Sequence, residues 1–500
     1  MNGRRTAVII GAGIGGITTA VNLAKNGYRV DIYEKNSSPG GRCSQLVRNG
    51  HRFDLGATML LMPGIYRRVF RSLGIDFDSA GLTKLDTLYR ICFDDGEIIS
   101  FSTDLQEMEE QHEKIEPGSF SRSSEYISKG YRFYLLALES LIGRNFYSFS
   151  EFATFKNMLL LVRLKTYISH NRYVKRFFRH PHLRMAYTFQ NIYVGQSPFT
   201  SPALFAMVPA AELMEGSFFP AGGMHSIVQR MVAEAEKLDV QFHYNTAIKG
   251  IRINGNRARG IELNSGDLID ADVVVANADL PYVYRELLPD KKLSARLDRN
   301  KYSCSAICFH WGIRKAYPAL AHHNVFLSDN YSISLDRIFR DKLVDDKPSF
   351  YVHAPARTDP SAAPEGEDTI SVIVAVGHID SKAHQDWNEL KNATRKAVIE
   401  RLKKFGLTDF EENIKFEICF TPESWENAVN ISRGSVFGSI SHSIFQMGYF
   451  RPHNRHDRYK NLYFAGGSTH PGNGIPNVLL SAMLTSERIL KEQPDDRDFK

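Results

Sequence analysis

A short run of apolar residues near the N-terminus predicts the first buried strand of a parallel sheet. Residues 7–10 are all apolar, which is typical of strands that are covered on both faces. Residues 17–25 then carry apolar side chains at helical spacing, and Gly27 suits the end of that helix. Residues 28–33 form a second strand-like run that leads to Glu34. The pattern therefore predicts a strand–helix–strand unit.

Three glycines occupy the turn between the first strand and the helix. Gly11, Gly13 and Gly16 form the motif G-x-G-x-x-G. The first permits a tight turn, the second lets the backbone approach a pyrophosphate, and the third lets the helix pack closely on the strand. The helix N-terminus offers free N–H groups to phosphates, and the carboxylate of Glu34 can accept hydrogen bonds from ribose hydroxyls. We therefore predict a dinucleotide-binding site.

The residues after the second strand favour FAD over NAD. Gly41 and Arg42 follow a short loop, and a guanidinium there can meet a phosphate or the edge of a flavin. The segment "RNGH" is typical of a tight hairpin turn, and a D-x-G-x-T segment that ends at Thr58 comes next. This continuation is not expected of NAD dehydrogenases. It resembles the FAD-binding start of the flavoprotein amine oxidase and phytoene desaturase superfamily.

A loop rich in glycine and proline precedes the last helix. The chain reads as a strand "LYFAG", a loop "GSTHPGNGIP" and a helix "NVLLSAMLTSERIL". Pro476 suits the first helical turn, where a missing N–H costs nothing. The helix begins with unsatisfied N–H groups and a partial positive charge, which would stabilise an anionic reduced flavin. We predict that Gly466, Gly474, Ile475 and Pro476 contact FAD, with a plain helix cap as the alternative.

Charge is distributed unevenly along the 500 residues, whose formal net charge is +6. Residues 152–211 contain no Asp or Glu, yet they carry basic residues interleaved with aromatic residues and leucines. The basic residues are Lys156, Arg163, Lys165, Arg172, Lys175, Arg176, Arg179 and Arg184. A basic, aromatic, amphipathic stretch suits an anionic membrane surface. We predict membrane contact over residues 152–184, with a solvated basic face as the alternative and nucleic acid disfavoured.

Other features of the composition exclude several classes of protein. No run of about 18 apolar residues lacks a charge, so no transmembrane helix is expected. The segment "MNGRRT" leads directly into the glycine motif, so no signal peptide is expected. Five cysteines suggest free thiols in a reducing cytoplasm rather than a disulfide framework. Cys304 and Cys308 lack a second pair of ligands at zinc spacing, so we predict no metal site.

Four separated segments make the family resemblance specific. The segment "GYFRPHNRHDRYKNLYFAGGSTHPGNGIPNVLLSA" resembles the C-terminal signature of bacterial-type carotenoid desaturases, the family of phytoene desaturase and of the C30 enzyme acting on diapophytoene (dehydrosqualene). The segments "FDLGATMLLMPGIYRRVF", "SFFPAGGMHSIVQRM" and "YSCSAICFHWGI" resemble further parts of the same family. The match runs nearly end to end. It implies an FAD-dependent, membrane-associated dehydrogenation of a long linear isoprenoid.

The resemblance and the later strand patterns together predict the domain organisation. Residues 247–279 read as a three-stranded meander with Asn-Gly and Ser-Gly turns. We predict an α/β fold with a Rossmann-like FAD-binding domain of the GR2 type and an α+β substrate domain, monotopic and membrane-associated. The FAD domain is assigned to residues 1–105, 225–299 and 441–500. The substrate domain is assigned to residues 106–224 and 300–440. Residues 495–500 form a polar tail.

The resemblance also implies a mechanism, in which a hydride passes from a carbon beside the conjugated chain to flavin N5, and a base or water removes the neighbouring proton. Glu212 matches a carboxylate that precedes the family's F-P-x-G-G element, and a buried carboxylate can serve as a base; structural pairing with an arginine is the alternative. His470, beside the flavin loop, is the second catalytic candidate, and bracing of the loop is the alternative. Reduced FAD would pass electrons to a quinone or oxygen.

The uncharged segment 185–211 suits a tunnel for a polyene or an ordinary core.

Related reactions remain alternatives at this point. The segment "YPALAHHNVF" resembles 1-hydroxycarotenoid 3,4-desaturases and terminal-methyl oxidases, and carotene isomerases share the frame, whereas the "THPGNGIP" loop resembles desaturases. An amine oxidase would require an aromatic cage, which no motif demands. A prenyl-binding escort protein would not need the glycine motif, Glu34 and the flavin loop together. The expected location is the cytoplasm, with peripheral attachment to the cytoplasmic membrane.

Overall fold

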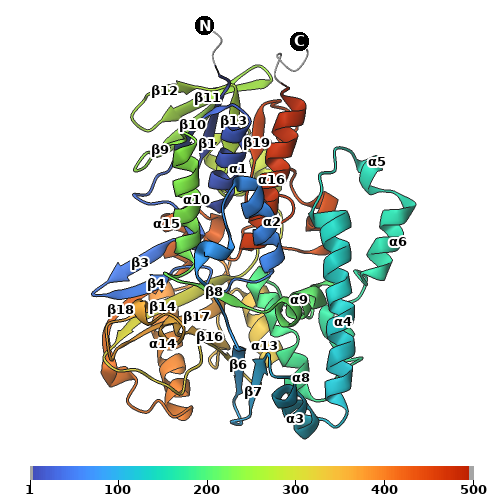
Figure 1. The fold of residues 1–500 in the computed structure, drawn as a ribbon, viewed down its shortest axis with the longest axis vertical. Coiled ribbons are helices and arrows are strands. Elements are labelled where there is room, and N and C mark those ends of the chain that lie inside the picture. Colours follow the sequence, from blue (N-terminus) through green and yellow to red (C-terminus); the bar gives the residue numbers. More distant parts are fainter. Residues whose placement is uncertain (1–3, 495–500) are drawn as a thin grey trace.

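The computed structural model describes residues 4–494 and contains two large sheets with a group of helices beside them (Figure 1). The first sheet has five parallel strands in the order β19–β13–β1–β2–β9. Its strands are β1 (Thr6–Ile10), β2 (Arg29–Tyr33), β9 (Gln241–His243), β13 (Val273–Ala276) and β19 (Leu462–Phe464). They come from three separated parts of the chain. The polar tail at residues 495–500 lies outside the described residues.

Successive side chains of the central strand β1 face two different layers. Ala7 and Ile9 pack with α1 (Ile14–Lys25), α10 (His225–Lys237) and α16 (Ile475–Glu492). Val8 and Ile10 pack on the side of the antiparallel meander. That meander consists of β10 (Ile248–Asn254), β11 (Arg257–Leu263) and β12 (Leu268–Asp270). Coverage on both faces explains why β1 is an unbroken apolar run, and β1, α1 and β2 confirm the predicted strand–helix–strand unit.

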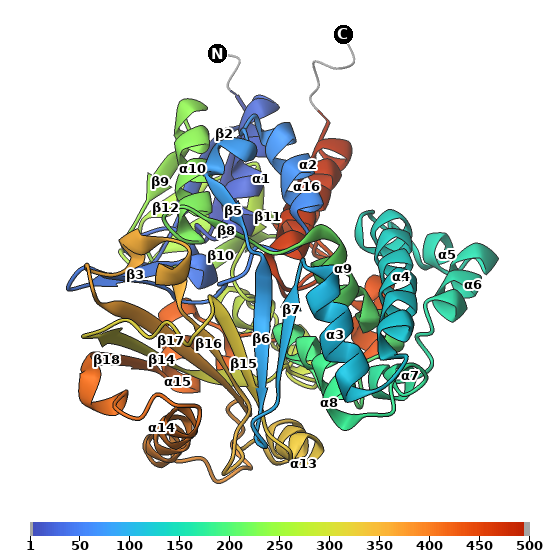
Figure 2. The same cartoon turned by 60° about the horizontal axis from the view of Figure 1, so that its bottom comes forward.

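The second sheet has seven strands in the order β18–β14–β17–β16–β15–β6–β7 (Figure 2). These are β6 (Thr87–Phe93), β7 (Ile98–Ser102), β14 (Ser305–Ile313), β15 (His323–Leu327), β16 (Phe350–His353), β17 (Asp368–Val376) and β18 (Ile414–Phe420). Because strand side chains alternate, Ile307 and Phe309 pack towards α14 (Trp387–Lys404), whereas Ala306 and Cys308 face a large cavity. One face of this sheet is therefore core and the other is a wall of the cavity.

The edge strands of the second sheet correct one boundary of the predicted domains. Residues 1–105 were assigned to the FAD domain, yet β6 pairs in parallel with β15, and β7 pairs with β6. The pairing joins residues more than 200 positions apart along the chain, from Arg90 to Asn324. Local pattern cannot show which sheet a strand joins, because that choice depends on distant partners. The remainder of the domain division stays a prediction.

A group of helices, drawn on the right in Figure 1, contributes residues such as Ala137, Phe152 and Leu161 to the cavity wall. It contains α3 (Leu105–Ile115), α4 (Ser119–Ala137), α5 (Phe149–Phe152), α6 (Phe155–Arg163), α7 (His170–Val174), α8 (Pro181–Ala186) and α9 (Met207–Glu215). The basic stretch lies here and is not one amphipathic surface, because Tyr173, Phe177 and Phe178 are core residues. Its exposed apolar residues lie instead on α6 and at Tyr167, shortly after that helix. None of the helices within residues 4–494 combines the length and hydropathy needed to cross a bilayer.

Candidate active site

A cavity of about 770 Å³ extends from the glycine motif of the first sheet to the wall of the second sheet. At one end it is lined by the turn after β1 and by Glu34. At the other end it is lined by apolar residues from the helices and from β14–β17, among them Leu204, Phe205 and Ile373. The two ends therefore belong to one continuous space. A cofactor and an apolar substrate can meet within it.

The glycine turn has the geometry of a phosphate cradle. Gly11 has a φ of 98° and donates its N–H to the carbonyl of Tyr33 at 2.8 Å. Gly13 precedes α1, and no side chain caps the N-terminus of that helix. A Cβ at Gly16 would lie 2.2 Å from the carbonyl oxygen of Gly11, so only glycine lets α1 approach β1 this closely. The free helix N-terminus offers N–H groups to the cavity.

Residues from the next segments surround the same end of the cavity. Glu34 accepts the backbone N–H of Ala12 at Oε2 and that of Asn36 at Oε1, both at 2.9 Å, which orients its carboxylate on the wall. Gly41 and Arg42 also line the cavity, and the Arg42 guanidinium donates to the carbonyl of Val436 at 3.2 Å. Burial lowers the pKa of Arg42.

Thr58 lies on the wall beside the second sheet. Its hydroxyl is 2.9 Å from the hydroxyl of Tyr351, a residue of β16 that also lines the cavity. Thr58 therefore connects the D-x-G-x-T segment to the sheet of the second half.

The loop before α16 completes this end of the cavity. Gly466, Gly474, Ile475 and Pro476 all line it. Gly474 has a φ of 85° and precedes α16, and no side chain caps this second helix N-terminus. Two uncapped helix N-termini thus face one space. The partial positive charge at the N-termini of α1 and α16 suits a cofactor that carries a pyrophosphate and a ring that becomes anionic on reduction.

The buried Arg451 fixes the loop before α16 by hydrogen bonds to its backbone carbonyls. The sequence did not predict this role. Arg451 is 1% exposed and donates to the carbonyls of Thr469 at 2.9 Å and of Gly467 at 2.6 Å, as well as to other carbonyls of residues 440–446. Burial lowers its pKa to about 9. The signal was present in the segment "GYFRPH", but the arginine's partners are carbonyls, which no side-chain motif reveals.

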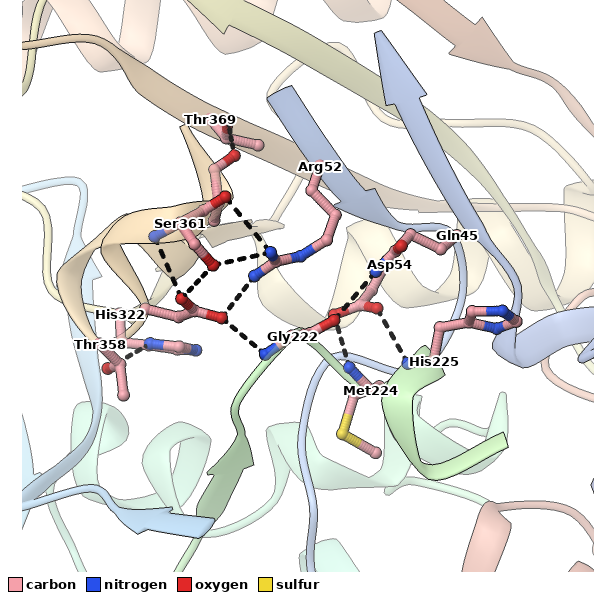
Figure 3. A network of polar contacts seen from close by, with 12 residues as sticks. Gln45, Arg52, Asp54, Gly222, Met224, His225, His322, Thr358, Ser361 and Thr369 are labelled. Carbon is pink, nitrogen blue, oxygen red and sulfur yellow. Dashed lines mark hydrogen bonds and ion pairs between the residues drawn. The ribbon is translucent and has the colours of Figure 1, made fainter. Parts of the chain in front are cut away.

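Asp54 is a second residue whose role the sequence did not define. It is buried at the end of β4 (His51–Asp54) and accepts the N–H groups of Met224 and His225 at 3.0 and 3.3 Å (Figure 3). Burial raises its pKa to about 6. Gln45, from the facing strand, donates to the carbonyl of Gly222 at 3.0 Å. The hairpin is thereby fixed to the start of α10, and with it the loop that carries Gly41 and Arg42.

Asn277 joins the three pieces of the nucleotide-binding end. Its backbone N–H donates to Ile10 at 2.8 Å, and its side-chain amide donates to the carbonyl of Ala465 at 2.8 Å. Its side chain also touches the glycine turn, because a Cβ at Gly13 would lie 2.7 Å from its Oδ1. The "VVVAN" run contains this residue, but the run alone does not reveal contacts with both ends of the chain.

Glu212 does not lie on the wall of the cavity. It is fully buried on α9 and accepts a hydrogen bond from the Tyr89 hydroxyl at 3.2 Å, while its other oxygen has no partner among the described residues. The Tyr89 hydroxyl in turn accepts from Gln190 at 2.8 Å. No arginine pairs with the carboxylate in the described part of the chain. Burial raises the pKa of Glu212 to about 8. Because this carboxyl does not reach the cavity wall, its catalytic role stays a prediction and would require Tyr193 or another wall residue as a link to the cavity.

The buried carboxyl of Glu212 predicts a specific dependence of stability on pH. Its folded pKa of about 8 lies above the ordinary value of 4.5. Its stabilising contribution is therefore fully present below pH 4.5 and is lost as pH rises towards 8. We expect Glu212→Gln to remove this loss and to raise the free energy of unfolding at pH 8 by a few kcal/mol, on the order of 1.4 kcal/mol per pKa unit. Urea unfolding of both proteins at pH 5 and pH 8 measures it; equal differences at both values would contradict the expectation.

His470 braces the flavin loop and does not line the cavity. It is 4% exposed, and its Nε2 lies 3.0 Å from the carbonyl oxygen of Arg144. Burial lowers its pKa to about 4, so the ring is neutral at physiological pH. Its neighbours Ser468 and Pro471 do line the cavity. The geometry favours the bracing role, and the proposed polarising role stays a prediction.

The cradle fits a flavin dinucleotide. Glycine turns allow close approach, two uncapped helix N-termini suit phosphate and reduced ring, and a carboxylate suits ribose. A second sheet places an apolar space directly beside this cradle. The fold and the site therefore define an FAD-dependent oxidoreductase.

Comparison with known proteins agrees with this class. The family model for flavin-containing amine oxidoreductases matches residues 14–490. The zeta-carotene-forming phytoene desaturase of Myxococcus xanthus is 38% identical over 97% of this chain and 94% of its own length. The phytoene desaturase of Fusarium fujikuroi is 37% identical over 98% and 90%. The 4,4'-diapophytoene desaturase (4,4'-diaponeurosporene-forming) of Staphylococcus aureus is 33% identical over 97% and 98%.

Solved structures show the same fold at low identity. An oxidoreductase from Methanosarcina mazei superimposes with a TM-score of 0.63 at 17% identity, covering 96% of this chain and 100% of that one. Putrescine oxidase bound to putrescine gives a TM-score of 0.63 at 14% identity, covering 98% and 99%. The chain belongs to the flavin-containing amine oxidoreductase family, and within it to the group of phytoene and diapophytoene desaturases.

Proposed function

We propose that this protein is an FAD-dependent carotenoid desaturase that dehydrogenates a long linear isoprenoid of the phytoene or diapophytoene type. The observation that carries the proposal is the single cavity that joins the cofactor cradle to an apolar space. The segment 185–211, for which a tunnel lining or an ordinary core was expected, contributes Phe189, Ile192, Leu204 and Val208 to the cavity wall. An extended hydrocarbon can therefore lie against the cofactor without contact with water.

The charges on the wall argue against an amine substrate. The charged residues that line the cavity are Glu34, Lys35, Arg42 and Asp279, all at the cofactor end. Asp279 is occupied by the hydroxyl of Ser439 and the N–H of Ser432. Within residues 4–494, the apolar half of the cavity presents no carboxylate to an ammonium group, and burying an unpaired cation there would be costly. A hydrocarbon meets no such penalty.

The residues of the chain perform positioning and exclusion of water. FAD held by the cradle would supply the acceptor for a hydride from a saturated carbon next to the conjugated chain. The uncapped N-terminus of α16 would stabilise negative charge on a flavin ring held beside it. The apolar wall holds the reacting carbon close to the cofactor and excludes water, which would otherwise capture a cationic centre. Transfer of electrons onward to a quinone or oxygen completes the proposed cycle.

Exposed apolar residues lie on α5, on α6 and shortly after it, and in residues 444–450, segments that also contribute residues to the cavity wall. We call them the mouth patch: Phe149, Phe155, Met158, Leu159, Val162, Tyr167, Ile444, Phe445 and Phe450. Three of them, Ile444, Phe445 and Phe450, also line the cavity. Exposed basic residues such as Lys156 and Arg163 lie among them on α6. This combination supports peripheral attachment to an anionic membrane, from which a lipophilic substrate can enter directly, and hence a location at the cytoplasmic membrane.

Expression in a host that accumulates one precursor tests the proposed reaction. Strains that accumulate phytoene or diapophytoene would each receive the chain, and pigment absorption and mass would be recorded. We expect new conjugated carotenoid from one of the two, which identifies the substrate length. If FAD-bound protein gives no coloured product from either, the proposal fails for these substrates. The reaction would then be a later one, on a hydroxylated carotenoid or at a terminal methyl group.

A further inference from the structure

Three buried histidines lie beside the predicted flavin site. His323 begins β15 and His322 directly precedes it, and His353 ends β16, where it pairs directly with His323. They are 5%, 0% and 1% exposed, and one ring nitrogen of each lies within 4.8 Å of the others. Phe219 packs on His322 and His353 at ring distances of 4.5 and 5.6 Å. Such a group of buried imidazoles needs an explanation, because each must satisfy two ring nitrogens.

Short polar contacts link His323 to the cavity wall, and link His353 and His322 to the surface. The Tyr351 hydroxyl, on the cavity wall, lies 2.6 Å from Nδ1 of His323. Nε2 of His353 lies 3.1 Å from Nε2 of His322. Nδ1 of His322 lies 2.7 Å from the hydroxyl of Thr358, which is partly exposed (Figure 3).

One set of tautomers satisfies all of these contacts, with every hydrogen bond donated in the direction from Tyr351 towards Thr358. If the Tyr351 hydroxyl donates to Nδ1 of His323, that histidine carries its proton on Nε2. If His322 donates from Nδ1 to Thr358, its Nε2 accepts from Nε2–H of His353. Nδ1 of His353 is then an acceptor. A neutral imidazole can hold a proton on either nitrogen, so each tautomer is available.

This assignment leaves two ring nitrogens without a hydrogen-bond partner within residues 4–494, one a donor and the other an acceptor. Nε2 of His323 and Nδ1 of His353 are buried and have no hydrogen-bond partner among the described residues. The first is a donor and the second an acceptor, and their rings stack at a centroid distance of 5.4 Å. A single water molecule that bridges them would satisfy both. The contacts would then run without a break from Tyr351 to Thr358.

We propose that Tyr351, His323, His353 and His322 form a proton path that leads from the cavity wall to the surface at Thr358. The proposal rests on the proposed desaturation. Each dehydrogenation removes a hydride, which FAD accepts, and one proton. That proton passes to the Tyr351 oxygen as the tyrosine gives its own proton to His323. Each following group accepts one proton and gives up another, so one proton enters at the cavity and one leaves at Thr358.

A divalent metal is the competing occupant of the three histidines, and the surrounding charges disfavour it. Burial, together with the positive charge of Arg357, lowers the pKa of His322 to about 3. The pKa values of His323 and His353 also lie well below the ordinary value because of burial, and Arg52 and His310 contribute at His353. The nearby carboxylate of Asp359 is paired with Arg52. Two arginines thus stand close to the histidines and the nearby carboxylate is already paired, which disfavours a dication, whereas a chain of neutral groups passes a proton without holding it.

The tautomers can be measured on the resting protein without any carotenoid. Protein labelled with ¹⁵N-histidine would be studied by long-range ¹H–¹⁵N correlation, with His322→Gln, His323→Gln and His353→Gln used for assignment. We expect neutral rings, protonated at Nε2 in His323 and His353 and at Nδ1 in His322. Protonation of His323 at Nδ1, or zinc or another metal at one equivalent in the purified protein, would overturn the proposal. This outcome does not depend on whether the proposed reaction is correct.

Variants of the path residues, compared with the wild-type protein, test whether the path serves the desaturation reaction. Tyr351→Phe removes one hydroxyl, and His353→Phe breaks the middle of the path. His310→Phe is the matched control, because His310 is equally buried in the same sheet, bonded at 2.9 Å to Ser371, and outside the path. We expect the two path variants to retain FAD and KM but to reduce flavin about 100-fold or more slowly, as loss of acid–base transfer does. Wild-type rates in both would refute the path, whereas an inactive wild-type enzyme would refute the desaturation instead.

Discussion

Gly16→Ala is expected to produce a protein that no longer retains FAD through purification. The added methyl group would lie 2.2 Å from the carbonyl oxygen of Gly11 and 3.1 Å from Oδ1 of Asn277. Both contacts are backbone or tightly held amide atoms, so α1 must move away from β1. That movement displaces the uncapped helix N-terminus that faces the cofactor. Overpacking of this kind costs about 1–3 kcal/mol, and since about 1.4 kcal/mol is tenfold in affinity, we expect FAD binding to weaken by between about 5-fold and about 100-fold.

The absorption ratio at 450 and 280 nm of purified protein, followed by titration with FAD, measures this loss. Gly27→Ala is the matched control because Gly27 lies at the other end of the same helix. It has a positive φ of 84°, and a Cβ there would meet no atom of the described residues within 4 Å. The control therefore carries backbone strain of about 1 kcal/mol but leaves the cofactor turn intact. Equal loss of FAD in both variants would show that general instability, and not the turn, is responsible.

The parts of the site that the sequence predicts are those built from neighbouring residues. Gly11, Gly13 and Gly16 carry a fixed spacing because a strand, a turn and a helix must follow one another within a few residues. Pro476 and Gly474 likewise mark a helix start. In each case the physical requirement is local, and the structure places these residues around one cavity, except Gly16, which lies behind the turn.

The parts that the sequence does not predict depend on distant partners. The carboxyl of Glu212 lies beside Tyr89, 123 residues earlier in the chain, and no motif records that pairing. Alternation within residues 152–184 did not separate the exposed Phe155 from the buried Phe178, because short helices change direction there. The three histidines meet through strand pairing between β15 and β16, although "HH" is visible in the sequence.

Replacing Phe155 and Phe445 by serine is expected to release the protein from anionic membranes. Their side chains are 85% and 77% exposed, on two segments of the mouth patch. Insertion of an aromatic side chain into the membrane interface removes much of its apolar area from water, which contributes about 1.5 kcal/mol or more for each ring. We therefore expect the pair to weaken partitioning about 100-fold, since about 1.4 kcal/mol is tenfold. Co-sedimentation with vesicles that contain phosphatidylglycerol measures it.

The matched control separates the mouth patch from exposed apolar residues in general. Val47→Ser removes a side chain that is 65% exposed on β3 (Gln45–Arg48), on the opposite side of the molecule from α5 and α6 in Figure 1. It should leave partitioning unchanged. Lys156→Gln with Arg163→Gln should weaken binding only to vesicles that carry anionic lipid, because the charge contribution falls off within a Debye length of the surface. If the serine pair still sediments like wild type, the mouth patch does not face the membrane, and the substrate must reach the cavity by transfer from another carrier.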